Sequence, residues 1–316
     1  MLTFFTIPKP FHGYLNIIQT NSIQSWLRLY PECEIILFGN DDGIDETASR
    51  FGLKHVPVIE RNSYGTPLLN SIFDKAQDLA THRLVCYVNT DIILMNDFIE
   101  AVQRIRKKHF LMVGQRWNID LKDEIDFKSI DWDIKLRKHV YKVGEPLGEG
   151  GIDYFVFPKG LLTNIPPFAI GRSAWDNWLI YKARSIHVPV IDVSRVILAV
   201  HQNHTYTYYQ GTKSGIWKGP EAKVNQELSG GPEHFFTLRD ATWFLAQKGL
   251  KPAWTIKHII RQWDTLPILF PRMNIKVFCY KVFLYLYINL YFSITKFCHG
   301  KVLSSFKKKI RGCFSR

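Results

Sequence analysis

Short apolar runs alternate with segments of helical periodicity through the first two hundred residues, and this alternation limits the possible folds more than any other feature. Helical patterns cover 17–29, 45–51, 67–80 (with Thr66 as N-cap and Pro67 as first helical residue), 97–106 and 173–184. Strand-like runs cover 2–7, 34–38, 54–59, 84–88, 110–113 and 188–200. Strands separated by helices require right-handed crossovers, so we predict an α/β fold with a mostly parallel sheet flanked by helices.

The positive charge is concentrated at one end of the chain. Of the net charge of +13, residues 251–316 carry +12, from thirteen Lys and Arg against Asp264, whereas residues 1–250 carry +1. Proteins that bind nucleic acid usually spread basic residues over a folded face. We therefore predict a folded body at 1–250, a basic aromatic helical tail at 251–316, and no nucleic-acid partner.

The cysteines and the N-terminus suggest a reducing compartment. The five cysteines match neither a zinc site nor a C-x-x-C redox pair. The N-terminus lacks a basic segment and reaches Pro8 before an apolar core develops, so it predicts a first strand rather than a signal peptide. We expect a cytoplasmic protein.

Polar residues follow three of the predicted strands. In parallel sheets ligands bind beyond the carboxyl ends of the strands, which selects residues 6–9, 40–42 and 89–91. Asp91, after the apolar run 84–88, could ligate Mg²⁺ or Mn²⁺ on a diphosphate, because hard cations favour oxygen ligands. A plain loop turn is the alternative. Segment 117–150 is weakly periodic and is predicted as a mobile loop or an insertion on the acceptor side, and segment 207–231 is predicted as a loop.

Four segments together resemble a known family. The sequence YVNTDIIL at 87–94 is similar to the D-x-D segment of GT-A glycosyltransferases, with Asn89 in place of the first aspartate. FTIPKPF at 5–11, LFGND at 37–41 and GRSAWDNW at 171–178 are similar to other segments of GT-A-like proteins. The resemblance covers about residues 2–210. It implies a GT-A-type catalytic domain over 1–250, a nucleotide-sugar donor and a divalent metal, Mn²⁺ or Mg²⁺.

The same resemblance implies roles for individual residues. Asp91 would be the main carboxylate on the metal, with His201 or His204 completing the site. Asp41 or Asp42 would accept a hydrogen bond from a base, uracil being favoured, although a helix-capping turn explains both equally well. The other residues implied to bind the nucleotide sugar are Thr6, Pro8, Lys9, Thr66, Asn70, Asn89, Asp153 and Trp175. Helix capping also explains Thr66.

Asp176 is the candidate general base. It lies between Trp175 and Trp178, and desolvation in a partly apolar site would raise its pKa into a useful range. The resemblance places Asp176 where inverting enzymes have their base. The alternative is a helix N-terminal carboxylate with both tryptophans in the core.

The tail predicts contact with a membrane surface. Residues 282–294 are uncharged, but spanning a bilayer needs about 20 apolar residues. Tyr, Phe and the basic run 307–311 favour an interfacial helix within 275–316. A tilted or re-entrant span and a buried C-terminal helix are the alternatives. A peripheral enzyme on the cytoplasmic face would suit a lipid-linked glycan acceptor.

We therefore expect an inverting, metal-assisted glycosyltransferase that moves a sugar to a glycan hydroxyl. A sugar-phosphate nucleotidyltransferase would need a glycine-rich loop after the first strand, where Pro8-Lys9-Pro10 is stiff. The remaining alternatives are a catalytically silent nucleotide-sugar-binding scaffold and a nucleic-acid-binding protein that uses the basic tail.

Overall fold

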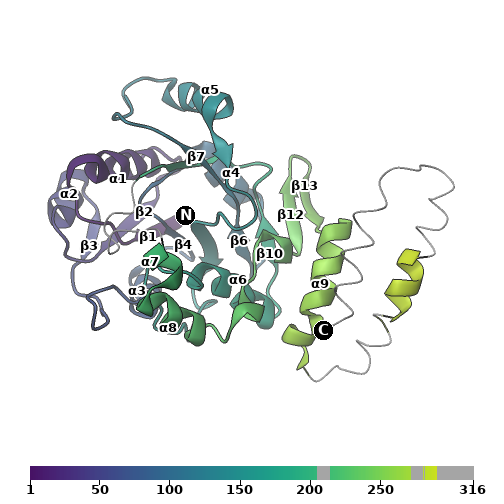
Figure 1. Ribbon diagram of the computed structural model, residues 1–316. Helices are drawn as coiled ribbons and strands as arrows, with labels where there is room; N and C mark the ends of the chain where they lie inside the picture. Colours follow the sequence, from purple (N-terminus) through teal and green to yellow (C-terminus); the bar gives the residue numbers. More distant parts are fainter. Residues whose placement is uncertain (205–213, 272–279, 281, 290–316) are drawn as a thin grey trace. The chain divides into compact units, whose positions relative to one another are not determined.

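The computed structural model describes residues 1–204, 214–271, 280 and 282–289 (Figure 1). The chain divides into two compact units, Met1–Arg261 and Gln262–Arg316. The first unit holds both sheets and every residue predicted to form the site.

The predicted α/β fold with a mostly parallel sheet flanked by helices is confirmed. The main sheet has the order β13-β12-β10-β6-β9-β4-β1-β2-β3. Its neighbouring strands pair in parallel, except that β9 runs antiparallel to β4 and β6, and β13 runs antiparallel to β12. The strands are β1 Leu2–Thr6, β2 Glu34–Phe38, β3 Lys54–Val56, β4 Leu84–Val88, β6 Leu111–Val113, β9 Tyr154–Pro158, β10 Val190–Asp192, β12 Trp243–Ala246 and β13 Gly249–Pro252.

A second, small sheet occupies part of the segment predicted to be a loop. Its order is β5-β11-β7-β8, formed by Ile92–Ile93, Ala199–Gln202, Arg116–Ile119 and Glu145–Pro146. Helix α5, Trp132–Val143, packs Leu136 and Val140 into a cluster with Val200. The loop prediction for 117–150 was therefore wrong. Because few of these residues are apolar and charged residues separate them, the segment has no clear helical periodicity in sequence.

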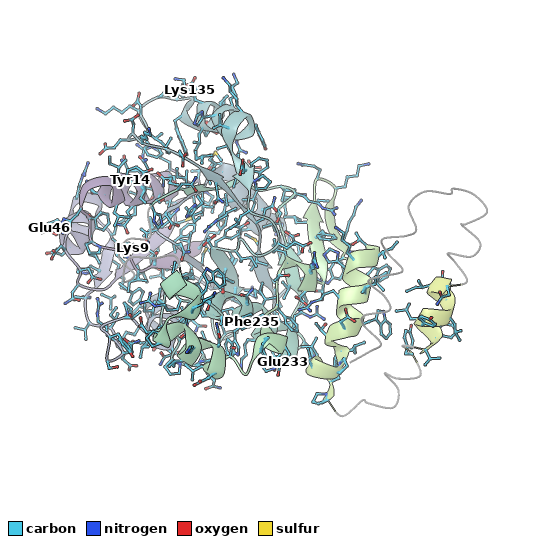
Figure 2. The ribbon with its side chains drawn as sticks, in the orientation of Figure 1. Lys9, Tyr14, Glu46, Lys135, Glu233 and Phe235 are labelled. Atoms are coloured by element: carbon cyan, nitrogen blue, oxygen red, sulfur yellow. The ribbon has the colours of Figure 1, made fainter. Side chains whose placement is uncertain are left out.

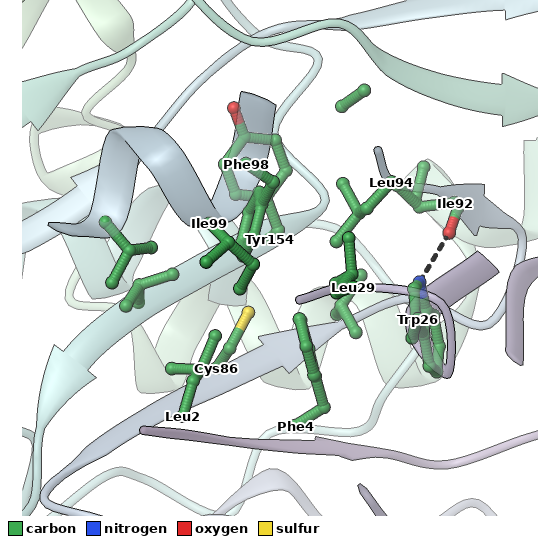
Figure 3. Packing of buried hydrophobic residues seen from close by; sticks show 14 of the residues in the cluster. Leu2, Phe4, Trp26, Leu29, Cys86, Ile92, Leu94, Phe98, Ile99 and Tyr154 are labelled. Carbon is green, nitrogen blue, oxygen red and sulfur yellow. Dashed lines mark hydrogen bonds between the residues drawn. The ribbon is translucent and has the colours of Figure 1, made fainter. Parts of the chain in front are cut away.

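One face of the main sheet packs against α1 Gly13–Trp26, α2 Ile44–Phe51 and α4 Asn96–Arg104. Successive side chains of a strand alternate between faces, and Leu2 and Phe4 of β1 join Cys86 of β4 on this one (Figure 3). Trp26 stacks on Phe4, with ring centroids 5.7 Å apart. Its indole N–H also donates to the carbonyl of Ile92 at 2.9 Å, so α1 is fixed beside the small sheet.

The opposite face is aromatic and packs against α3 Leu69–Leu79 and α6 Trp175–Ser185. Phe73 of α3 stacks on Phe157 with centroids 5.7 Å apart, and Trp175 of α6 packs edge-on against Tyr87 at 5.4 Å. Trp175 is therefore part of the core as well as a wall of the cleft described below. Helices therefore pack against both faces of the main sheet.

The predicted start of α3 is corrected by the structure. Leu68, rather than Thr66, is the N-cap, and the helix begins at Leu69. Isolated bridges pair Arg61 with Pro67, across a turn, and Leu68 with Ala169, which keeps Pro67 and Leu68 out of the helix. Long-range pairing therefore prevails over the local N-cap signal of Thr66 and Pro67.

The segment 207–231, predicted as a loop, is partly helical, so that prediction was also wrong for its described part. It contains α7 Ser214–Lys218 and α8 Pro220–Leu228. The side chain of Asn225 in α8 accepts from the amide of Ala169 at 2.8 Å and donates to the carbonyls of Ala169 and Ser173. These polar contacts hold α8 in place and have no periodic signal in the sequence. Two short 3-10 helices follow, at Pro232–His234 and Leu238–Asp240.

The C-terminal unit is described only in part. Helix α9, Ile256–Leu269, enters it, residues 282–289 are helical, and Trp263 stacks on Tyr280 with ring centroids 4.1 Å apart. Most of the predicted interfacial segment 275–316 lies outside the described residues. Within the part of the chain that the structure describes, no helix combines the length and the apolar character needed to cross a bilayer.

Candidate active site and metal centre

A cleft of about 1060 Å³ lies at the carboxyl edge of the parallel strands. Because β9 runs antiparallel to β4, Asp153, the residue before the start of β9, also lies at this edge. Eleven of the predicted site residues line the cleft: Pro8, Lys9, Asp41, Thr66, Asn89, Asp91, Asp153, Trp175, Asp176, His201 and His204. Lys9 is labelled in Figure 2.

Three predicted residues do not line the cleft. Thr6 is fully buried, with its hydroxyl 3.0 Å from that of Thr90. Asp42 is exposed and lies 3.2 Å from the Nε2 of His12. Asn70 lies in the first turn of α3, away from the cleft lining. Neighbouring positions in sequence therefore diverge in space: Asp41 reaches the cleft and Asp42 does not.

Asp91, His201 and His204 form a compact cluster whose ligand atoms all lie within 4.8 Å of one another. The Oδ2 of Asp91 is 3.1 Å from the Nε2 of His204 and 3.6 Å from that of His201. Both imidazoles are almost completely buried, and the carboxylate is largely buried.

The small sheet assembles this cluster. Strands β5 and β11 pair in an antiparallel register that opposes His201 to Ile92, the residue after Asp91. The backbone amide of Gln202 donates to the carbonyl of Asp91 at 3.1 Å. Since the side chain of Gln202 also donates to the carbonyl of Ile18 at 2.8 Å, the end of β11 is tied to α1. Two segments more than a hundred residues apart are thus held in one geometry.

The cluster has the chemistry of a divalent-metal site. Burial by itself would raise the pKa of Asp91, but His201 and His204 outweigh it and hold that pKa well below its usual value. Among the described residues, the Oδ1 of Asp91 and the Nδ1 of His201 are buried without a hydrogen-bond partner. Buried polar atoms normally have partners, and one carboxylate with two imidazoles suits a first-row divalent cation.

Asn89 is committed to a hydrogen bond with Asp153. Its Nδ2 donates to the Oδ1 of Asp153 at 2.6 Å, and its backbone amide donates to the Asp153 carbonyl at 3.0 Å. The second oxygen of Asp153 accepts from the Nη1 of Arg116 at 2.8 Å. Asp153 is thus clamped at the cleft floor between an amide and a guanidinium group. A Cβ at Gly151 would lie 2.8 Å from that of Leu147, so glycine is needed in this approach.

Asp176 has the electrostatics of a general base. Burial, reinforced by the negative charge of Asp153, raises the pKa of Asp176 to about 6, although the backbone amide of Asn177 donates to it at 2.9 Å. Ala174, the N-cap of α6, has φ of 88° and is fully buried. Non-glycine residues rarely adopt this conformation, and such outliers gather at functional sites.

Two contacts shape the wall near β1 and β2. The side chain of Gln19 holds the backbone of Lys9 by accepting from its amide at 2.7 Å and donating to its carbonyl at 2.9 Å. Asp41 accepts from the Nη2 of Arg61 at 3.1 Å. The loop after β1 is therefore fixed by α1.

The cleft is also lined by Arg116, Arg172 and Glu221, for which the sequence predicted no role. Glu221 of α8 accepts from the Nε of Arg172 at 2.8 Å and from the Nδ2 of Asn62 at 2.8 Å. Burial would raise the pKa of Glu221, but Asn62, Thr66 and Arg172 together keep it below its ordinary value. No local pattern marks these residues, because each depends on a partner far away in the sequence.

The chain is similar in structure to several solved nucleotide-sugar transferases. S. aureus TarS 1-349 in complex with UDP-GlcNAc is 16% identical over 65% of this chain and 59% of its own, with a TM-score of 0.43. Glucosyl-3-phosphoglycerate synthase from Mycobacterium tuberculosis, in complex with Mn²⁺, UDP and phosphoglyceric acid, is 16% identical over 73% of this chain and 79% of its own, with a TM-score of 0.43. The mannosyltransferase PcManGT from Pyrobaculum calidifontis, in complex with GDP-Man and Mn²⁺, is 16% identical over 66% of this chain and 59% of its own, with a TM-score of 0.41.

Sequence comparison adds no assignment, since no protein-family model and no curated protein matches the chain. At identities and TM-scores this low, the structural similarities do not assign an activity. The functional proposal below depends on the residues of the cleft.

Proposed function

We propose that this protein is a metal-dependent glycosyltransferase that moves a sugar from a nucleotide-diphosphate sugar to an acceptor hydroxyl. The observation that carries the proposal is the joint occupation of one cleft by the cluster of Asp91, His201 and His204 and by the partly buried Asp176. A metal site and a raised-pKa carboxylate at the carboxyl edge of a parallel sheet suit a donor with a diphosphate and an acceptor with a hydroxyl group.

The cleft residues divide into three groups, which would bind the nucleotide, the transferred sugar and the cation. Pro8, Lys9, Asp41 and Thr66 would contact the nucleotide, with UDP favoured, because Asp41 lies at the end of β2 and can accept from a uracil imide. Asp153 and Asn89 would lie at the transferred sugar. Asp91, His201 and His204 would hold the cation. Thr6 would support the site from beneath, through its contact with Thr90.

The proposed reaction inverts the anomeric centre. The acceptor oxygen bonds to the anomeric carbon while the bond from that carbon to the diphosphate oxygen breaks. The hydroxyl proton goes to the carboxylate of Asp176, and the electron pair of the broken bond leaves on the nucleoside diphosphate. The cation, when bound, neutralises charge on the departing diphosphate. Arg116, whose Nη1 lies 2.8 Å from the Oδ2 of Asp153, would hold that carboxylate in position beside the sugar.

The donor set favours Mn²⁺ over Mg²⁺. Imidazole nitrogens suit first-row transition metals, whereas Mg²⁺ prefers oxygen ligands and retains its waters. Two of the three side chains in the cluster are histidines.

A thermal-shift series tests the proposal. The protein is titrated with UDP, GDP, UDP-GlcNAc and UDP-glucose, each with Mn²⁺, with Mg²⁺ and with EDTA. We expect at least one nucleotide to raise the melting temperature with Mn²⁺, by RT ln(1 + [L]/Kd) in free energy, and to lose the effect with EDTA. If no nucleotide raises the melting temperature with Mn²⁺, with Mg²⁺ or with EDTA, the proposal fails. Binding without hydrolysis or transfer would instead identify a silent scaffold.

For the tail we propose docking on an anionic membrane surface on the cytoplasmic side, and with it a lipid-linked glycan as acceptor. The support is the sequence of 275–316, with its aromatic run and its basic end. Sedimentation with vesicles of phosphatidylglycerol and phosphatidylcholine checks it. Binding should weaken steeply with added salt and should disappear with neutral vesicles. Equal binding to both kinds of vesicle would contradict the proposal.

A further inference from the structure

Trp217 is an exposed aromatic side chain on the wall of the cleft. Its exposed fraction is 59%, and it lies in α7, beside α8 in Figure 1. Trp175 and Trp178, by contrast, each pack against another aromatic ring in the core. Among the tryptophans of the described residues, only Trp217 and Trp254 make neither a ring–ring contact nor a cation–π contact. Of these two, Trp217 alone lines the cleft.

The backbone of Trp217 is held firmly although its ring is open. The carbonyl of Ile216 accepts from the amide of Ser173 at 3.0 Å, and the carbonyl of Trp217 accepts from the Nε2 of Gln226 at 3.1 Å. Asn225, next to Gln226 in α8, binds the carbonyl of Ser173 at 3.1 Å. The backbone of Trp217 is therefore tied to the same frame as the segment that carries Asp176, three residues after Ser173.

An exposed indole in the same cleft as a candidate general base is suited to a sugar ring. The axial C–H bonds of a pyranose form a weakly positive, apolar face, and the face of an indole is negative. Stacking on Trp217 would cover apolar area that now faces solvent. The hydroxyl groups at the rim of the sugar would remain free for Asp176.

We propose that Trp217 is the stacking platform for the acceptor sugar. This inference rests on the proposed function, because it assigns the acceptor side of the same cleft to a pyranose with an apolar face. The contact with Ser173 ties Trp217 to the segment of the base, whereas the metal cluster is built from β5 and β11.

The test measures sugar binding apart from nucleotide binding. Maltotriose, cellotriose and chitotriose are titrated into the wild-type protein, W217A, W217F and the control W254A, by saturation-transfer NMR and calorimetry, without metal or nucleotide. Trp254 is 75% exposed and does not line the cleft. We expect at least one trisaccharide to bind, W217A to weaken it about tenfold or more, W217F to retain most of the affinity, and W254A to match the wild type.

A parallel titration with UDP and Mn²⁺ separates the two sides of the cleft. UDP affinity should be equal in W217A and the wild type. The proposed stacking role of Trp217 would be overturned by any of three results: no trisaccharide binding by the wild type, unchanged trisaccharide binding in W217A, or a loss of UDP affinity in W217A equal to its loss of trisaccharide affinity. Failure of UDP to bind the wild type, with trisaccharide binding still lost in W217A, would instead remove the transferase and leave the sugar subsite.

Discussion

Asn89 and Asp153 face each other across the antiparallel pair β4–β9, with the Nδ2 of Asn89 donating to the Oδ1 of Asp153 at 2.6 Å. This contact accounts for an asparagine at the first position of the D-x-D-like segment. An aspartate there would set two carboxylates against each other, and like charges in a buried site cannot both ionise freely. Asp153 already supplies the carboxylate on this side of the site.

Asn89→Asp should therefore impair the protein rather than restore a full D-x-D site. Loss of the hydrogen bond and the added repulsion should lower the free energy of unfolding by about 1–3 kcal/mol, measured by urea titration at pH 7.5. The double variant Asn89→Asp/Asp153→Asn exchanges donor and acceptor and should recover part of that loss, because Asp153→Asn also weakens the pair with Arg116. Additive effects in this double-mutant cycle would contradict a direct interaction.

Removing the carboxylate charge from the metal cluster should weaken cation binding. Asp91→Asn keeps the size of the side chain but removes its charge, so Mn²⁺ affinity should fall by about tenfold to a hundredfold or more. Calorimetric titration with Mn²⁺ measures this, together with the Mn²⁺-dependent thermal shift by UDP. Asp42→Asn is the matched control, because Asp42 is an exposed aspartate outside the cleft. Equal Mn²⁺ affinity in wild type and Asp91→Asn would exclude the cluster as the site.

The raised pKa of Asp176 predicts how activity depends on pH. A general base acts only when deprotonated, so kcat/KM should fall on acidification below about pH 6, tenfold per pH unit. Asp176→Asn should reduce kcat by about a hundredfold to ten-thousandfold and abolish that limb of the profile. A profile of Asp176→Asn with the same acid limb would remove Asp176 from its role.

The same pKa shift predicts a cost in stability. The folded-state pKa of Asp176 lies above the unfolded value of 3.8, so the folded state binds more protons between about pH 4 and pH 6. Stability from this group is full below pH 4 and is lost as the pH rises through about 6. At pH 8, Asp176→Asn should thus be more stable than the wild type by about 1–3 kcal/mol, with little difference at pH 4. Denaturant titrations at the two pH values measure it, and an equal difference at both would contradict it.

The Arg172–Glu221 pair should contribute far more to stability than an exposed pair. Both side chains are largely buried. Removing one partner leaves a buried charge, so Glu221→Ala should cost about 3–5 kcal/mol in unfolding free energy. Glu149→Ala breaks the exposed pair with Arg239 and should cost less than about 1 kcal/mol. Similar losses in both variants would show that the cleft pair is not buried in solution.

Local patterns in the sequence sufficed for part of the candidate site. The apolar run before Asn89 marks β4, and polar residues after β1, β2 and β4 mark the cleft edge, because strand period and turn chemistry depend on near neighbours. Asp91 could be singled out for the same reason, whereas Asp176 was singled out by its flanking tryptophans and by the family resemblance. The antiparallel direction of β9 could not, since its apolar residues fit either direction of pairing.

The sequence by itself determined strands β1, β2, β3, β4 and β6 of the main sheet and the polar residues that follow β1, β2 and β4. Only the tertiary structure decided which of these residues come into contact. The pairing of β5 with β11 brings Asp91 to His201 and His204, and the pairing of β4 with β9 brings Asn89 to Asp153. Helix α8 holds the backbone of Trp217 near the segment that leads to Asp176. These contacts join residues far apart in the chain. Such pairings are selected by the burial and hydrogen bonding of whole elements, which no short stretch of sequence encodes.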